Sequence, residues 1–132
     1  MFYLIRGRSR PNGSDIVMMK PAAGVAFLPG DALVFANGVV AKAAATAKPT
    51  HVSAGLHAAA STEKVATYPV REGMEFMTTF AADASSVAEG SRVTLHTDSA
   101  QVTATTASGV ARIERKLGTG KAGTKVVVTF NP

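Results

Sequence analysis

Residues 30–42 read Gly-Asp-Ala-Leu-Val-Phe-Ala-Asn-Gly-Val-Val-Ala-Lys, and this segment carries the clearest structural signal in the chain. Two short apolar runs flank Asn37 and Gly38, and an Asn-Gly pair favours a β-hairpin because both residues accept the positive φ of a type I′ turn. The pair Pro29-Gly30 just before it is typical of a tight turn. We therefore predict a hairpin over residues 32–42 with a two-residue turn.

A second unit of the same kind follows further along the chain. Residues 90–104 again run glycine, apolar segment, polar turn and apolar segment. Alternate side chains of an extended strand share a face, which places Val93 and Leu95 together and Thr94 and His96 on the other side. We interpret the two units as a repeated architectural element rather than as a catalytic motif.

The remaining apolar segments are also short, and Gly, Pro or Asn separates them. Strands are expected at residues 15–19, 50–57, 64–70, 74–80, 110–117 and 124–130. Only residues 81–89, with Asp83 as the cap, are expected to form a helix, of about two turns. Short strands at roughly ten-residue spacing indicate an all-β fold, either a jelly-roll-like sandwich or a small β-barrel of short antiparallel strands.

Length and composition suggest one body with a terminal extension. The chain has 132 residues, enough for one core, and we divide it into an extended basic N-terminal arm, residues 1–14, and a single β domain, residues 15–132. Alanine accounts for 24 of the apolar residues, so the core is expected to be thin, as between two sheets. The absence of cysteine excludes disulfides and thiolate metal sites. The apolar run at residues 2–5 is too short for a signal peptide or a membrane span, so we expect a soluble protein made and used inside the cell.

Basic side chains gather at the two ends of the chain, whose formal net charge is +5. Residues 1–20 carry four basic side chains against one acidic, and residues 109–132 carry five against one. The middle of the chain is slightly acidic. Such asymmetry favours contact with a polyanion or with an acidic surface.

Three arginines near the start alternate with small residues, so an extended chain would project all of them to one side. Two interpretations stay open: an arm that lies along a partner's acidic surface or a phosphate backbone, and a solvated terminus. The large apolar residues that precede the arginines favour docking, because such side chains gain nothing from contact with water. The candidate contact residues are Phe2, Leu4, Arg6, Arg8 and Arg10.

The residue types that usually carry chemistry form no catalytic or ligand set. Gly118-Thr-Gly-Lys121 shares letters with a phosphate-binding loop, but Arg115 stands in the place of its first glycine and Ala122 in that of the Ser or Thr that holds magnesium. The three histidines lack the spacing of metal ligands, and there is no Gly-x-Ser-x-Gly motif. We expect no enzymatic activity, no cofactor and no bound metal.

One family resemblance covers most of residues 24–118. The turn Pro29-Gly30-Asp31 leads into a short strand and an Asn-Gly tip. The segments Val65-Ala-Thr-Tyr-Pro-Val-Arg71 and Ala88-Glu-Gly-Ser-Arg-Val-Thr-Leu-His96 continue the same succession of strands and turns. This pattern resembles the small head decoration, or cement, proteins of tailed bacteriophages. The apolar and then basic start of the chain departs from the acidic or neutral N-terminus that is commoner in that family.

The resemblance implies a non-enzymatic structural protein with a jelly-roll or related β-barrel fold. Such a protein binds the outside of the icosahedral head and holds neighbouring major capsid protein subunits together. The implied partners are the major capsid protein and further copies of the chain, as a dimer or trimer, with no membrane and no direct nucleic-acid contact. The implied location is the outer surface of the virion, after assembly in the host cytoplasm.

The competing interpretation is a small basic β-barrel that binds nucleic acid. The sequence pI of about 9.9 favours it. Against it, the two Tyr and six Phe residues are not interleaved with Arg and Lys, as stacking platforms for bases require. Addition to capsids without binding to DNA at moderate salt would separate the two functions.

Overall fold

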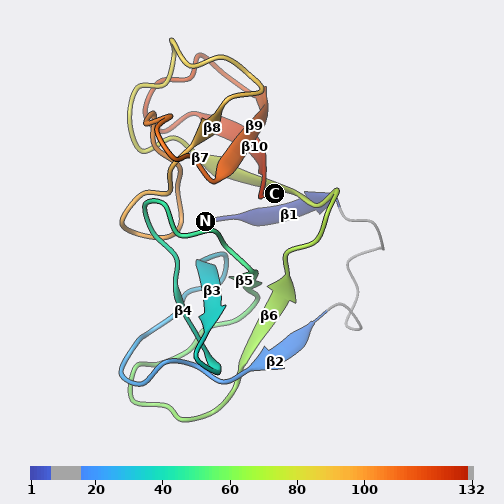
Figure 1. Cartoon of the computed structure of the whole chain (residues 1–132), viewed down its shortest axis with the longest axis vertical. Coiled ribbons are helices and arrows are strands. Elements are labelled where there is room, and N and C mark those ends of the chain that lie inside the picture. The colour runs from blue at the N-terminus through green and yellow to red at the C-terminus, as the bar shows by residue number, and fades with distance from the viewer. Residues whose placement is uncertain (7–15, 131–132) are drawn as a thin grey trace.

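Residues 1–6 and 16–130 are described in the computed structural model, and all of their regular structure is β (Figure 1). Two antiparallel sheets of five strands each are formed among these residues. Sheet A contains, in spatial order, β1 (Tyr3–Arg6), β7 (Glu75–Thr79), β10 (Lys125–Thr129), β9 (Ala111–Lys116) and β8 (Arg92–Val93). Sheet B contains, in spatial order, β2 (Val17–Met19), β6 (Val65–Pro69), β5 (His51–Ser53), β3 (Ala32–Ala36) and β4 (Val39–Lys42). The predicted fold class, a sandwich or small barrel of short antiparallel strands, is confirmed.

The hairpin predicted around Asn37 and Gly38 is formed by β3 and β4. The strands pair with Ala36 directly opposite Val39, so only two residues lie in the turn. The φ angles of these two residues are 53° and 80°. Both are left-handed, as a type I′ turn requires. The predicted two-residue turn is therefore confirmed.

Replacing Gly38 by valine is expected to lower the free energy of unfolding by about 1–3 kcal/mol, because a β-branched residue at positive φ is strained. The φ of Gly38 is 80°, and a Cβ there would meet no atom within 4 Å, so the whole effect comes from the backbone. Urea denaturation followed by circular dichroism measures the change. An unchanged midpoint would mean that the backbone at this position is not held in the left-handed region.

Sheet B curls so that its two edge strands meet. Just beyond β2, Pro21 bridges to Val40 of β4. Ala22 N–H donates to Val40 O over 2.8 Å, and Val40 N–H donates to Lys20 O over 2.9 Å. This bridge covers backbone groups that an open sheet would leave unpaired. The curled sheet encloses a small core of its own, made by Phe27, Leu33, Val40 and Val65.

The second predicted hairpin is present within residues 90–104. Leu95 bridges to Val102 in antiparallel orientation, and Val93 and Leu95, which were predicted to share a face, are both buried. Val102 also bridges to Phe80, which directly follows β7. The hairpin therefore links β8, at one edge of sheet A, to the end of β7, next to the other edge. This link means that sheet A is curled as well.

The main core draws residues from both sheets. Sheet B contributes Ala32 and Val52, and a short bridge between Ala45 and Leu95 joins the loops of the two sheets. The larger share comes from sheet A and its loops, namely Phe76, Phe80, Val93, Leu95, Ile113, Val126, Val128 and Phe130. The strand β10 lies in the middle of sheet A, and its residues 126–129 are buried on both faces. That burial accounts for its continuous apolar and β-branched composition.

The helix expected at residues 81–89 is wrong, since no helix occurs among the described residues. The backbone of this segment bonds to the loop between β9 and β10 instead: Ala84 N–H donates to Gly120 O over 2.8 Å. The Asp83 carboxylate accepts a hydrogen bond from Ser85 N–H over 2.9 Å, which closes a local turn rather than a helix cap. Among the described residues there is likewise no helix with the length and apolar character needed to cross a membrane.

The first six residues belong to the β body. β1 pairs with β7 as the edge strand of sheet A, and in Figure 1 it lies on the side of that sheet nearer to sheet B. Phe2, directly before β1, is only 3% exposed. Residues 7–14 of the arm expected at residues 1–14 lie outside the described residues. The described part of this arm is extended, as predicted, but packs against the chain's own core.

Candidate interaction surfaces

Phe2 and Leu4, predicted to contact a partner, lie against the chain's own core instead. The Phe2 ring packs edge-on against the Phe130 ring with centroids 5.1 Å apart, and Phe130 in turn contacts Phe76 at 5.4 Å. Phe2 N–H donates to Gly30 O over 2.9 Å. Leu4 is half-buried and packs on the same core. Phe2 is therefore not available to a second molecule while β1 stays in place.

Of the three arginines predicted to contact a partner, one lies within the described residues and two do not. Arg6 ends β1, and its backbone lies opposite Glu75 after a shift in register. Arg8 and Arg10 lie outside the described residues. The structure brings Phe2, Leu4 and Arg6 together on or beside one strand. The side chains of Tyr3 and Ile5, also on β1, are exposed.

The histidines lie in different surroundings. His51 Nδ1 lies 2.8 Å from Thr50 Oγ1, and its ring contacts that of Phe35 with centroids 6.1 Å apart. Burial lowers the pKa of His51, which favours its neutral form. His57 is buried against the Phe27 ring. In the part of the chain that the structure describes, no group of three or more His, Asp or Glu side chains is arranged to hold a metal ion.

The loop at residues 118–123 packs closely against the backbone of residues 84–85. Gly120 has a φ of 85°, and a Cβ at this position would lie 3.0 Å from Ser85 Cα. The Thr124 hydroxyl donates to Lys121 O over 2.7 Å, which closes the loop. The glycine that gives this segment the letters of a phosphate loop is therefore required by close contact with a neighbouring backbone.

A depression of about 380 Å³ lies beside the connection between β6 and β7. Its lining consists of Lys48, Pro49, Thr50, Val70, Arg71, Glu72 and Phe130. The Thr50 hydroxyl is already used within the chain, because it accepts a hydrogen bond from Phe35 N–H over 2.8 Å. The lining residues include no pair of nucleophile and base, so we place no active site there.

A row of apolar side chains crosses the outer face of sheet B, with one exposed methionine and two half-buried alanines. Met18 of β2 lies directly opposite Ala66 of β6. On the other side of β6, Ala54 N–H donates to Ala66 O over 2.8 Å. Residues opposite each other in antiparallel strands point to the same face, so these three side chains form one row.

Two exposed leucines follow nearby in the chain: Leu56 stands two residues after Ala54, across a bend at Gly55, and Leu28 lies opposite Leu56. Phe27 and His57 bridge to each other and are both buried, so the next residues, Leu28 and Leu56, point to the opposite, outer side. Leu56 is 76% exposed. We call this row the apolar strip, and its members are Met18, Leu28, Ala54, Leu56 and Ala66. None of the five carries a charge.

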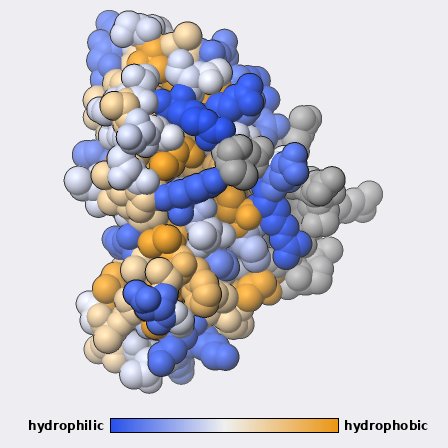
Figure 2. Space-filling view, viewed as in Figure 1, coloured by the Kyte–Doolittle hydropathy of each residue, from blue (hydrophilic) through white to orange (hydrophobic). Residues whose placement is uncertain are grey.

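The space-filling view shows apolar residues gathered over the lower part of the molecule, where sheet B lies, and hydrophilic residues more frequent over sheet A (Figure 2). Contiguous exposed apolar surface marks contact sites in soluble proteins, whereas singly scattered apolar residues do not. The apolar strip is therefore the strongest candidate contact surface among the described residues.

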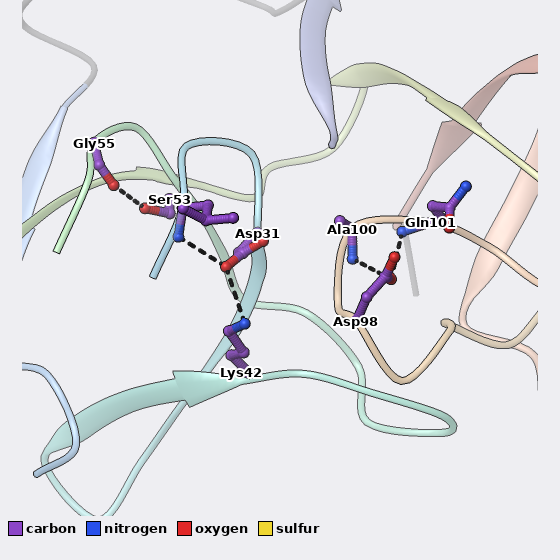
Figure 3. A network of polar contacts seen from close by, with 8 residues as sticks. Asp31, Lys42, Ser53, Gly55, Asp98, Ala100 and Gln101 are labelled. Atoms are coloured by element: carbon purple, nitrogen blue, oxygen red, sulfur yellow. Dashed lines mark hydrogen bonds and ion pairs between the residues drawn. The ribbon is translucent and has the colours of Figure 1, made fainter. Parts of the chain in front are cut away.

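A polar network holds the two turns that carry the exposed leucines (Figure 3). The buried carboxylate of Asp31 accepts a hydrogen bond from Leu28 N–H over 2.9 Å and faces Lys42 Nζ at 3.5 Å. The Ser53 hydroxyl donates to Gly55 O over 2.8 Å, directly before the second leucine. Because these bonds close both turns, the strip is presented by fixed backbone rather than by free loops.

Basic residues of sheet A are tied to carboxylates. Arg115 Nη1 donates to Glu75 Oε2 over 3.0 Å, and Arg112 Nε lies 3.6 Å from Glu114 Oε1. Arg92 and Arg112 lie directly opposite each other on β8 and β9. Part of the basic charge that the sequence concentrates near the C-terminus is thus balanced locally.

Sequence analysis did not single out the strip residues. Met18 lies in a short predicted strand, and Leu28 and Leu56 stand beside turns, far apart in the sequence. The one local signal was a large apolar residue directly before the Pro29-Gly30 turn, where a polar residue is more usual. In the comparisons with known proteins, no family model, no curated protein and no solved structure matches this chain.

Proposed function

We propose that this chain decorates the head of a tailed bacteriophage, where it binds the outside of the icosahedral shell and stabilises contacts between major capsid protein subunits. The observation that carries the proposal is the apolar strip on an all-β body. A decoration protein needs exposed contact area rather than a concave pocket, and the strip supplies such area. The resemblance of the sequence to cement proteins supports the same function. In this role the chain acts without a cofactor, as a dimer or trimer on the virion surface.

The strip suits a contact that salt does not screen. Burying a leucine or methionine side chain completely is worth roughly 1.5–3 kcal/mol, whatever the ionic strength. A single strip is small beside the roughly 800 Å² that each partner contributes to a standard protein interface. Copies that bind one another would attach to several shell subunits at once. The affinity of the linked copies for the shell would then exceed that of one strip.

A second candidate function is nucleic-acid binding through sheet A. Arg92 and Arg112 lie opposite each other on neighbouring strands, a placement that could contact successive phosphates. Glu114 beside Arg112 works against it, because it neutralises part of the charge that a phosphate would meet. Binding to DNA that falls steeply with salt would favour this function.

Occupancy on capsids tests the first candidate. Where a neighbouring reading frame encodes a major capsid protein, heads assembled from it are incubated with the purified chain over a range of salt concentrations. Leu56→Ser is expected to weaken attachment roughly tenfold or more at every salt concentration, since most of one leucine's burial is lost. Leu117→Ser is the matched control, because Leu117 is also an exposed leucine (51%) but directly follows β9, in the other sheet.

Occupancy of the two leucine variants shows whether the capsid contact lies in the strip. Equal occupancy of Leu56→Ser and the unmodified chain would place the capsid contact outside the strip. A chain that does not attach to the heads but binds DNA at moderate salt would replace the first function by the second.

A further inference from the structure

We propose that β1 is an exchangeable strand: β1 of one copy occupies the slot beside β7 of a second copy, so that chains link through their N-terminal strands. The inference concerns how copies of the chain associate. It goes beyond the proposed function, because it holds whether or not the chain decorates a capsid.

The slot that β1 fills is made largely by residues far from it in the sequence. Tyr3 lies opposite Met77, and Leu4 lies opposite Phe76, on β7. Phe2 sits edge-on to a phenylalanine that directly follows β10. The strand pairing and the aromatic contact of β1 thus both come from the C-terminal half of the chain. A second copy offers the same half in identical form.

The connection after β1 is long enough for exchange. Residues 7–16 separate β1 from β2, and ten residues can span up to roughly 33–36 Å. A compact chain of this length has a radius of gyration of about 14 Å, and this reach is more than twice that value. Chain length therefore does not tie β1 to its own body.

Exchange loses no contact of β1, because β1 makes the same residue contacts with its own chain in the closed arrangement and with the second copy in the exchanged one. β1 is an edge strand of sheet A, so it leaves without breaking the pairing between any two other strands. The edge of β7 that it uncovers is a template for a new strand, and a second β1 matches it residue for residue. Protein concentration then sets the balance between the two arrangements, as in other domain-swapped dimers.

Disulfide trapping tests where β1 lies, and the chain has no cysteine of its own to interfere. Two single variants, Tyr3→Cys and Met77→Cys, are refolded together from urea and then oxidised. Opposite residues of an antiparallel pair have Cα atoms about 4.5–5.5 Å apart, which is within the span of a disulfide. In the mixture, a disulfide between Y3C and M77C forms only when β1 of one chain lies against β7 of the other.

A covalent heterodimer is expected, and its yield should rise with concentration toward about half of all chains, the limit for random pairing of two variants in two-fold dimers. Mass spectrometry of the digested product identifies the Y3C–M77C linkage. The matched control is a mixture of Ala36→Cys and Val39→Cys, which are opposite residues of the β3–β4 hairpin. A two-residue turn keeps these two positions within one chain, so the control reports random collisions only.

A heterodimer yield no higher than that of the control at every concentration would overturn the proposal. The double variant Tyr3→Cys/Met77→Cys, oxidised in dilute solution, is expected to form the disulfide within one chain. Failure to do so would overturn the proposal as well, because the slot would not have the described register. Failure of the unmodified chain to attach to heads would count only against the proposed function.

Discussion

Phe2→Ala is expected to lower the free energy of unfolding by about 3–5 kcal/mol, the usual loss when a buried phenylalanine is truncated. The Phe2 ring is 3% exposed and packs edge-on against Phe130, which also contacts Phe76. Removing the Phe2 ring leaves a cavity beside the Phe130 ring, which stays in contact with Phe76 on its other side. Urea denaturation followed by far-ultraviolet circular dichroism measures the loss, which is a large share of the 5–15 kcal/mol typical of a small protein.

Tyr3→Ala is the matched control, since Tyr3 is the next aromatic residue on the same segment but is 54% exposed. Its truncation is expected to cost less than about 1 kcal/mol, as for most surface substitutions. A similarly small loss for Phe2→Ala would mean that the N-terminal segment contributes little to the core. That result would favour a separate arm at the N-terminus.

Local signals in the sequence were enough for the hairpins. The turn at Asn37 and Gly38 is specified by two residues that tolerate positive φ, and the flanking apolar runs fix which residues pair. The hairpin within residues 90–104 follows the same logic. Both could be predicted because the turn and both strands lie within one short segment, so no distant partner decides the outcome.

Distant pairing explains why the sequence did not reveal what the first six residues pack against. Four consecutive large apolar residues indicate that the segment is buried, but they do not say against what. The partner of β1 is β7, and that of Phe2 is Phe130, both of which lie far along the chain. A sequence read without these pairings could assign the burial equally well to a second molecule.

The candidate contact surface depended on register and could not be predicted. Leu28 and Leu56 point outward because Phe27 and His57 pair and are both buried. A shift of this pairing by one residue would turn the leucines inward and change the surface completely. The helix expected at residues 81–89 failed for a related reason. The polar groups of that segment find partners on the loop at Gly120, which its own sequence does not reveal.

Gly109→Ala is the second substitution with a large expected effect, a loss of about 3 kcal/mol or more in the free energy of unfolding. A Cβ at Gly109 would lie 2.4 Å from the Arg92 carbonyl carbon and 2.6 Å from Val93 N. Both atoms belong to the backbone of β8, so no rotation of a side chain relieves the overlap. Moving β8 away would also break the bond of 3.0 Å that Val110 N–H donates to Val93 O.

Gly55→Ala is the matched control for Gly109→Ala. A Cβ at Gly55 would lie 3.9 Å from Ala66 Cβ, which is ordinary contact, and the backbone there is not in the left-handed region. Alanine at such a position restricts the unfolded chain, so stability is expected to stay the same or to rise by up to about 1 kcal/mol. The two variants make the same chemical change and should move the urea midpoint in opposite directions or by very different amounts. Equal midpoints would mean that the turn before β9 gives way at little cost, and that β8 is not held against it as the structure describes.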